Sequence, residues 1–412
     1  MNDKKKTIFG ILIVVLVFAL VLETIMVIEY RTAVTTVSKQ LERERAEHAV
    51  DAETATATAK VEKISQLIDK YYLYDVDEEA VENGMLTGMM WGLGDIYSTY
   101  YDTKDMEKIN LHMEAEYSGI GAVMTTDSNY GLTMIVKTYA GSPSYEAGMM
   151  QGDYIVEVDG EDVSALDLST IVSKIKGEEG TPVSLEVYRV EEDEYVTFDL
   201  VRRRVEIPSV AGEMLDERIG YIQIESWDML TNSQFQTVME QLLSEGMKGL
   251  VVDVRNNPGG LVNAAANVLD YFVEDGGRLL YSVDKNDKET DYMAQDGLDS
   301  DIPLVVLTNG QSASSSEIFA GGIRDYKAGT LVGEKTFGKG IVQNIIDIGN
   351  GEAIKLTVAE YYLPSEVCIH GEGIEPDVKV QLPEALKKQS VISHEEDNQL
   401  QKAIEILGDK ME

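Results

Sequence analysis

From residue 205 to 380, continuous apolar stretches alternate with amphipathic ones. The apolar runs "KGLVVDVRN" (248–256) and "IPLVVLTN" (302–309) have the length of buried strands, whereas "TNSQFQTVMEQLLSEGM" (231–247) repeats its apolar residues with the period of a helix. Strands that are apolar on both sides belong to sheets covered by helices on both faces. Strands at 329–335, 340–347 and 352–363 are expected to complete the same sheet. The pattern therefore predicts an α/β domain over residues 205–380, with its site where strands end and helices begin.

A β-rich unit precedes this domain, over residues 105–204. Its apolar positions alternate in short runs bounded by turn residues, as in half-buried strands. We expect strands at 121–126, 132–139, 154–160, 183–189 and 195–201, and a helix at 166–176. The pattern predicts a separate small domain.

Two glycines, Gly119 and Gly121, flank Ile120 where the first of these strands begins. The N–H groups from Gly119 to Ala122 can therefore face an incoming anion. An extended peptide can add to the strand edge with its terminal carboxylate on these amides. A tight glycine turn that binds nothing is the alternative.

The first residues combine lysines with a long apolar run. Lys4 to Lys6 precede the stretch 7–28, whose one charged residue is Glu23. A helix needs about 20 apolar residues to cross a bilayer, and its basic end stays in the cytoplasm. We predict an uncleaved membrane anchor with the rest of the chain outside the cytoplasm. A cleaved signal peptide is the alternative, but the stretch lacks a small-residue cleavage site.

Between the anchor and the β-rich unit, the pattern is typical of helices. Residues 31–60 are rich in Ala, Thr and charged residues and contain no Gly or Pro, which favours a stalk. From 61 to 94, apolar residues recur at three- and four-residue steps. Trp91 and the neighbouring methionines are expected to pack between these helices.

The composition and the spacing of motifs argue against several classes of ligand. The chain has 412 residues and a net charge of −38 at pH 7, which argues against nucleic acids as partners, because binding them needs a basic surface. No loop has the ligand spacing of a calcium site, and Cys368 is the only cysteine. The segment "GEKTFGKG" matches part of a phosphate-binding loop, but Gly340 replaces the Ser or Thr that binds magnesium. We therefore expect no metal and no cofactor.

Four serines lie close together where the buried run 302–309 meets a helical pattern. They are Ser312, Ser314, Ser315 and Ser316. A serine hydroxyl becomes a nucleophile only when a base takes its proton. Of the four histidines, His370 alone lies in the α/β domain, in a loop typical of a surface histidine.

Two lysines offer an alternative base. Gly338 and Gly340 flank Lys339 and allow close approach of the backbone. On a strand, Lys339 and Gln343 would share one face. Lys335 follows a turn and has no such partner, so Lys339 is the better candidate.

The chain resembles the carboxy-terminal processing peptidases, also called tail-specific proteases, in "VVDVRNNPGG", "SASSSEIFAGGIRDYKAGTLVGEKTFGKGIVQ" and "LTVAEYYLPS". The similarity begins near residue 61 and includes an inserted PDZ domain. It implies a membrane-anchored or secreted serine protease with a Ser–Lys dyad and a core of crotonase/ClpP-like type. The helices before the PDZ domain are similar to those that relatives use for dimerisation, which leaves a homo-oligomer open.

In that family the lysine stands 25 positions after the nucleophile, and an orienting glutamine follows four positions later, which assigns Ser314, Lys339 and Gln343. The chain departs from the family pattern at Gln311 and Ser315, where Gly and Ala are usual. A nucleophile one position later, at Ser315, therefore stays open.

Burial is what makes such a dyad work. Free lysine has a pKa of about 10.4 and is charged, and burial among apolar groups is needed to lower it to roughly 7–8. Gln343 can hold the amine without adding a negative charge. The expected oxyanion donors are the N–H of Ser315, at the start of a helix, and the N–H of Gly259, with Gly260 behind it.

The expected architecture is multidomain α/β. Its segments are a cytoplasmic stub and single-pass membrane anchor (1–30), a stalk and helical region (31–104), a PDZ domain (105–204), a Ser–Lys protease core (205–380) and a C-terminal helical tail (381–412). We expect an extracytoplasmic endopeptidase that binds apolar protein C-termini and cleaves near them. The alternatives are a signalling protease that cuts a partner's extracytoplasmic domain, and a PDZ scaffold whose protease unit is dead.

Overall fold

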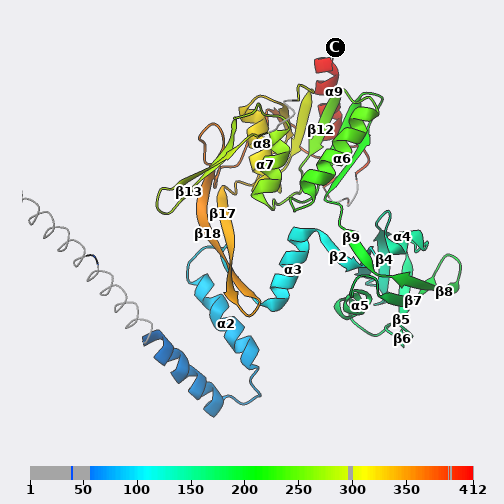
Figure 1. Ribbon diagram of the computed structural model, residues 1–412, viewed down its shortest axis with the longest axis vertical. Helices are drawn as coiled ribbons and strands as arrows, with labels where there is room; N and C mark the ends of the chain where they lie inside the picture. The colour runs from blue at the N-terminus through cyan, green and yellow to red at the C-terminus, as the bar shows by residue number, and fades with distance from the viewer. Residues whose placement is uncertain (1–38, 40–55, 296–299, 388, 390–391, 412) are drawn as a thin grey trace, which may run out of the picture. The chain divides into compact units, whose positions relative to one another are not determined.

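The structure is a computed structural model (Figure 1) that describes residues 39, 56–295, 300–387, 389 and 392–411. It divides into two compact units, residues 1–82 and 83–412. The predicted membrane anchor at 7–28 lies outside the described residues. Within the described residues, no helix is both long and apolar enough to span a membrane.

The helical region before the PDZ domain is present where the chain is described. Residues 56–71 are helical, and helix α2 spans Glu78–Trp91. The expectation that Trp91 and its neighbours pack in a core is mostly wrong. Met90 is buried, but Met89 and Trp91 have 71% and 78% of their surface exposed.

The β-rich unit contains a twisted sheet of order β3-β4-β5-β7-β8, with β6 paired to β5. Its elements are α3 (Thr103–Glu114), β2 (Glu116–Gly119), β3 (Ala122–Thr126), β4 (Thr133–Thr138), α4 (Pro143–Glu146), β5 (Asp153–Val158), β6 (Glu161–Asp162), α5 (Leu168–Ile175), β7 (Pro182–Arg189), β8 (Glu194–Val201) and β9 (Arg203–Glu206). The five predicted strands and the helix are confirmed, because alternate residues such as Ile135, Ile155 and Val187 enter its core. Strands β2 and β9 pair antiparallel and bring the two ends of the unit together.

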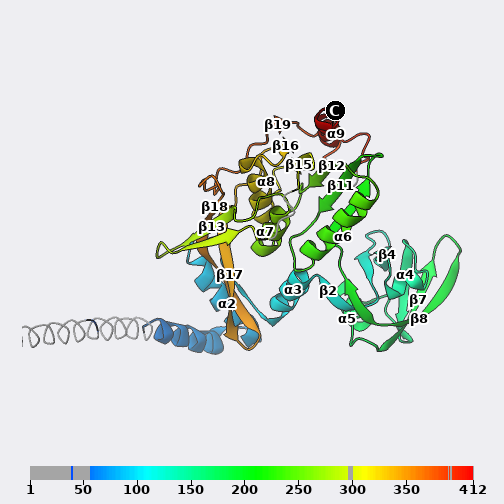
Figure 2. The ribbon, with the colours of Figure 1, turned by 45° about the horizontal axis from the view of Figure 1, so that its top comes forward.

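The α/β domain is built on a sheet of order β10-β11-β12-β15-β16-β19, in which β11 to β19 are parallel (Figure 2). Its elements are β10 (Val210–Met214), β11 (Ile219–Ile224), α6 (Thr231–Ser244), β12 (Gly249–Asp253), α7 (Val262–Asp270), β15 (Leu304–Thr308), α8 (Ser315–Asp325), β16 (Thr330–Gly333), β19 (Val378–Lys379) and α9 (Asn398–Met411). Every residue of β12 and β15 is buried, as their unbroken apolar runs predict.

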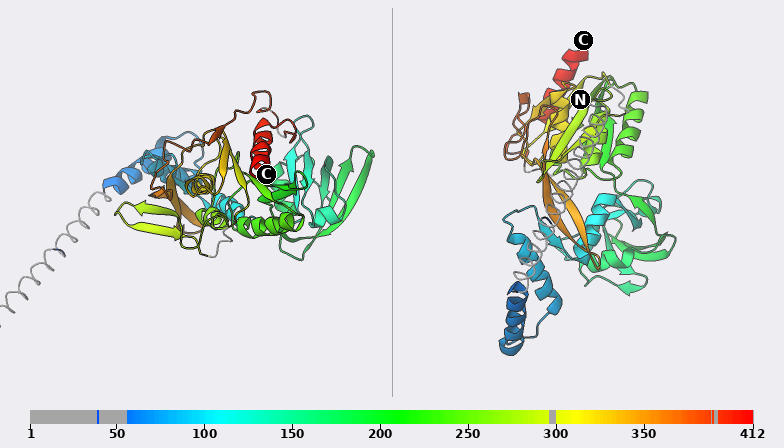
Figure 3. Two further views of the ribbon diagram at one scale, coloured as in Figure 1. Left: turned by 90° about the horizontal axis from the view of Figure 1, so that it is seen from above. Right: turned by 60° about the vertical axis from the view of Figure 1, so that its left-hand side comes forward.

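Helices cover both faces of this sheet (Figure 3, left). The core on one face includes Leu269 of α7 and Phe319 of α8, and the core on the other includes Leu400 and Leu407 of α9. The C-terminal helix predicted within 381–412 is present. It is not a solvated tail, because its apolar side chains form one stripe that closes the second face of the sheet.

A second sheet has the order β1-β18-β13-β14, with β17 also paired to β18. Its strands are β1 (Thr99–Tyr101), β13 (Arg278–Asp284), β14 (Glu289–Met293), β17 (Ile341–Gly349) and β18 (Glu352–Tyr362). The prediction that residues 340–347 and 352–363 complete the sheet of the α/β domain is wrong, because β17 and β18 belong to this second sheet and pair antiparallel as a long hairpin (Figure 1). The sequence pattern does not predict β13 and β14, because residues 278–293 have charged positions without a clear period.

Candidate active site

Three loops meet at one edge of the parallel sheet. Strands β12, β15 and β16 are neighbours and parallel, so their carboxyl ends lie at the same edge. The loop after β12 carries the predicted oxyanion glycines, the loop after β15 the serine cluster, and the segment after β16 the candidate lysine. The fold thus brings together three parts that are far apart in the sequence.

The hydroxyls of the serine cluster differ in what they donate to. Three donate to backbone carbonyls: Ser312 Oγ to Val254 O at 2.8 Å, Ser315 Oγ to Gly260 O at 2.9 Å, and Ser316 Oγ to Asn257 O at 2.9 Å. The Ser314 hydroxyl donates to no group in the described part of the chain. Its proton is therefore available for transfer to a base.

The backbone of Ser314 adopts an unusual conformation at the start of α8. Its φ of 55° is in the left-handed region, which residues other than glycine rarely adopt and which often marks functional sites. The buried hydroxyl of Tyr361 donates to Ser314 O at 3.1 Å. Ser314 is buried, with 8% of the residue exposed.

Glu317, which the sequence reasoning missed, links the serine loop to the lysine segment. This buried carboxylate accepts the N–H groups of Ser314 at 2.9 Å and Lys339 at 2.8 Å. It also accepts the N–H of Gly338 at 2.7 Å and the hydroxyl of Thr336 at 2.5 Å. A glutamate three residues after a helix-capping serine is the spacing of a capping box, the one signal that points to it in the sequence.

The amine of Lys339 is half-buried. Burial, followed by the charge of Lys355, lowers the pKa of Lys339, and the carboxylates of Asp95 and Glu317 oppose this effect. Lys339 Nζ lies 4.9 Å from the centroid of the Tyr97 ring. The direction of the pKa shift is the one that a lysine base requires.

Gln343 is close to Lys339 in the chain but is not bonded to it. Its Nε2 is buried and has no partner among the residues that the structure describes. A bulge between Val342 and Gln343 interrupts the alternation from which a shared face with Lys339 was predicted. In the described ranges, no hydrogen bond joins Lys339 Nζ to Gln343 or to Ser314.

The other candidate bases lie at the surface. The exposed amine of Lys335 is 3.5 Å from a carboxylate oxygen of Glu375. His370 is exposed, as expected for a surface histidine. Neither has the partial burial that lowers the pKa of Lys339.

The expected oxyanion loop packs against the serine loop. A side chain at Gly259, whose φ is 105°, would come within 2.7 Å of Ser314 Cβ, so the close approach requires glycine. The N–H of Gly259 donates to Asn257 Oδ1 at 2.9 Å. The N–H of Ser315, at the first residue of α8, has no intrahelical acceptor. In the part of the chain that the structure describes, the N–H of Ser315 donates to no group, whereas the N–H of Gly259 must leave Asn257 Oδ1 before it can bind an oxyanion.

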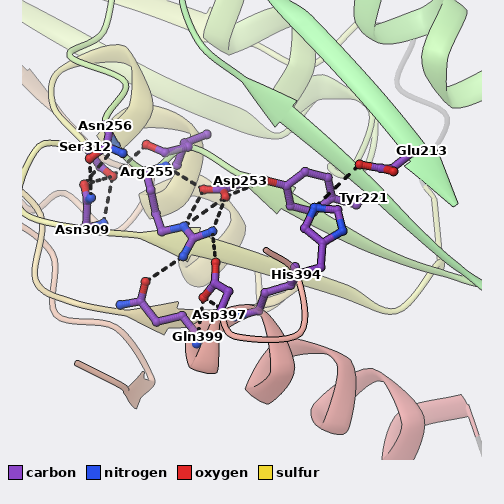
Figure 4. Close-up of polar contacts among 12 residues, drawn as sticks. Glu213, Tyr221, Asp253, Arg255, Asn256, Asn309, Ser312, His394, Asp397 and Gln399 are labelled. Carbon is purple, nitrogen blue, oxygen red and sulfur yellow. Dashed lines mark hydrogen bonds and ion pairs between the residues drawn. The ribbon is translucent and has the colours of Figure 1, made fainter. Parts of the chain in front are cut away.

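Arg255 fixes the start of this loop (Figure 4). Its Nη2 lies 2.6 Å from Asp253 Oδ2 and 2.8 Å from Asp397 Oδ2, and its Nη1 donates to Gln399 Oε1 at 2.8 Å. Burial works to lower the pKa of Arg255, but Asp253 and Asp397 raise it above its ordinary value. Because Asp397 and Gln399 belong to the C-terminal segment, this network ties α9 to the loop that carries Gly259.

The β-rich unit has a groove where the glycine loop was predicted to bind a peptide end. Gly119 ends β2, Ala122 begins β3, Ile120 is buried between them, and Gly121 has a φ of 78°. A cavity of about 180 Å³ lies between β3 and α5. Its apolar lining includes Ile120, Ala122 and Met124 on one side and Val172 and Ile175 on the other.

Two further side chains lie at the glycine-loop end of the groove. Lys176 Nζ is 5.0 Å from the centroid of the Tyr117 ring. Burial, with a smaller effect of Tyr139, raises the pKa of Tyr117 to about 12, although the N–H groups of Gly121 and Ala122 act to lower it. The Tyr117 phenol therefore lies beside the amides that were predicted to hold a carboxylate.

Comparison with known proteins gives the family. Three family models match, described as peptidase family S41 (residues 218–380), PDZ domain (134–189) and activating protease CtpB N-terminal domain (22–105). Carboxy-terminal processing protease CtpB of Bacillus subtilis is 31% identical over 81% of this chain and 70% of its own length. The carboxy-terminal-processing protease of Bartonella bacilliformis is 34% identical over 76% of this chain and 72% of its own length.

The chain belongs to the carboxy-terminal processing proteases. It is a serine-type peptidase with a PDZ domain and a core of peptidase family S41. Among solved structures, the photosystem II D1 C-terminal processing protease is 29% identical to this processing protease and matches it with a TM-score of 0.45. That match covers 78% of this chain and 88% of the other.

Proposed function

We propose that this processing protease cleaves peptide bonds near the C-termini of proteins, with Ser314 as nucleophile and Lys339 as base. The observation that carries the proposal is the Ser314 hydroxyl, which donates to no group in the described residues and lies on a loop that shares Glu317 with Lys339. The hydroxyl of Ser315 already donates to Gly260 O. This difference supports Ser314 over Ser315.

The reaction is an acyl transfer in two halves. Neutral Lys339 takes the proton of Ser314 Oγ while Oγ bonds to the carbonyl carbon of the substrate. The resulting ammonium gives its proton to the amide nitrogen as the C–N bond breaks, which leaves an acyl-enzyme on Ser314. Lys339 then takes a proton from water, which attacks the ester, and returns it to Ser314 Oγ. After a rearrangement of the two side chains, the Lys339 amine donates to the side-chain oxygen of Gln343, which orients it.

Backbone donors stabilise the oxyanion in both halves. The N–H of Ser315 lies at the N-terminus of α8, where the helix dipole also favours negative charge. The N–H of Gly259 is the second donor, once substrate displaces Asn257 Oδ1 from it. Gly260 lies behind this donor, where a side chain would meet the backbone of Trp227.

The PDZ groove binds the substrate tail before cleavage. The apolar lining between β3 and α5 suits apolar end residues, and the amides from Gly119 to Ala122 suit the terminal carboxylate. Lys176 adds a positive charge at the same end of the groove. The stretch 7–28 anchors the protease in the membrane, with the catalytic part on the extracytoplasmic side.

A cleavage assay tests this proposal. The substrate is a reporter protein whose tail ends in apolar residues, and the products are identified by mass spectrometry. We expect Ser314→Ala to reduce cleavage by about a million-fold, to background. Ser315→Ala, the matched control, keeps cleavage within about tenfold, because its N–H remains.

The same assay tests the role of the groove. Amidation of the tail removes the carboxylate, and the loss of charge-assisted hydrogen bonds is expected to raise KM about tenfold or more. For the two serine variants, cleavage that persists in Ser314→Ala but disappears in Ser315→Ala would show that Ser315 is the nucleophile. Equal cleavage of free and amidated tails would contradict tail recognition.

A further inference from the structure

Residues 94–98 lie against strand β18, next to the candidate base. Ser98 Oγ accepts the N–H of Thr357 at 3.1 Å and donates to Asp95 Oδ2 at 2.6 Å. Asp95 Oδ1 accepts the N–H of Tyr97 at 2.9 Å. Strand β1, which follows directly, pairs with β18. The backbone that carries Tyr97 is therefore held by hydrogen bonds on both sides of this residue.

A cavity of about 740 Å³ lies between this segment and the lysine strand. Its lining includes Asp95, Tyr97, Ile341, Thr357, Glu360 and His370. Ile341 stands two residues after Lys339. Lys339 itself does not line the cavity, but Tyr97, whose ring contacts its amine, does.

The surroundings of the Lys339 amine act on its charge in opposite directions. Nζ lies 4.9 Å from the centroid of the Tyr97 ring, and an aromatic face attracts an ammonium rather than a neutral amine. The charged groups that act on it are Asp95 from this segment, Glu317 from α8 and Lys355 from β18. Burial and Lys355 favour the neutral form, and the two carboxylates favour the ammonium.

We propose that Tyr97 and Asp95 are positioning residues for the base: they hold the Lys339 ammonium in a resting position, from which it moves to reach the Ser314 hydroxyl. The inference rests on the proposed Ser–Lys chemistry and adds two residues that affect when Lys339 can act as the base. In the resting position the amine faces the ring, and within the described residues it has no bond to Ser314. Loss of the ring or of the carboxylate removes a contact that favours the ammonium, so Lys339 loses its proton at lower pH.

The test is the pH dependence of Ser314 modification by an uncharged fluorophosphonate, measured on the full-length protein. In Tyr97→Leu, the acid limb of the profile is expected to shift by about half a pH unit toward lower pH, which is about a threefold higher rate on that limb. Asp95→Asn shifts it in the same direction, by removing a charge. Tyr97→Phe keeps the ring face and coincides with the unmodified protein.

A titration of Lys339 itself provides a readout independent of the nucleophile. In a Ser314→Ala background, the rate of Lys339 acylation by trace acetic anhydride is followed against pH by peptide mass spectrometry. The proposal predicts that Tyr97→Leu and Asp95→Asn lower the pKa of Lys339 and that Tyr97→Phe does not. An unchanged pKa in both variants, or a raised one, would overturn it.

The two measurements separate failure of this proposal from failure of the proposed function. If the unmodified protein and Ser314→Ala react with the phosphonate equally slowly, the dyad is wrong, whereas the lysine titration still reports on the Tyr97 contact. If Ser314 reacts but the profiles of all variants coincide, the dyad stands and the resting position is wrong. If Tyr97→Leu does not fold, the pH profile and the lysine titration of Asp95→Asn alone decide the proposal.

Discussion

At the scale of single residues, Ser314 and Ser315 have the same chemistry but different surroundings. The Ser315 hydroxyl donates to a backbone carbonyl, and a bonded hydroxyl of this kind contributes to stability instead of reactivity. Ser314 has an unusual backbone conformation, and its hydroxyl donates to no group among the described residues. The strain of this conformation is balanced by neighbours, chiefly Glu317 and Tyr361.

Glu317 gives a residue-scale prediction. Glu317→Gln keeps the shape of the side chain but replaces one acceptor oxygen with a donor, facing four donors that the carboxylate now satisfies. We expect a loss of about 1–3 kcal/mol in the free energy of unfolding, measured in urea. We also expect about a hundredfold slower reaction of Ser314 with a phosphonate, because the serine and lysine loops lose their common anchor.

The exposed Glu372 provides the control, because Glu372→Gln makes the same chemical change in the loop after β18 without burial. A Glu317→Gln protein with unchanged stability and reactivity would show that this carboxylate does not position the dyad.

Spacing in the sequence was enough to select Ser314 and Lys339 as candidates, because their separation in the chain matches a family pattern. It did not point to Tyr97 or Tyr361. Tyr97 reaches the lysine only because β1 pairs with β18, and Tyr361 reaches Ser314 only because the end of β18 lies near the start of α8. Such contacts depend on pairing between distant segments, which one sequence does not encode locally.

At the scale of elements, periodicity predicted most of the strands and helices, but not which sheet each one joins. Buried strands such as β12 and β15 were predicted correctly, because a strand covered on both faces must be apolar throughout. Strand β17 was assigned to the wrong sheet, since its partner is set by a hairpin and not by its own pattern. Helix α9 was predicted, but its role in closing the core was not.

The proposed anchor is an element whose behaviour is directly testable. We expect the full chain to sediment with membranes and to stay there in high salt, because about 20 apolar residues in a bilayer are not released by charge screening. A variant lacking residues 1–30 is expected in the supernatant. Full-length protein in the supernatant would contradict the anchor, and Lys4 to Lys6 changed to Gln gives a control that keeps the apolar stretch.

At the scale of the whole molecule, the candidate site exists only in the folded chain. The base, nucleophile and oxyanion loop come from three strand ends, and a segment before β1 contacts the base. The Arg255 network ties the oxyanion loop to the C-terminal segment (Figure 4). The net charge of −38 is consistent with a well-solvated surface and has no role in the proposed chemistry.

The identity of the residue that a fluorophosphonate modifies tests the central claim most directly. Peptide mass mapping is applied to the unmodified protein, to Lys339→Met and to Ser315→Ala. We predict an adduct on Ser314 in the unmodified protein and in Ser315→Ala, and its loss in Lys339→Met, where no amine can take the proton. An adduct on Ser315, or an adduct on Ser314 that forms at an unchanged rate in Lys339→Met, would contradict the account.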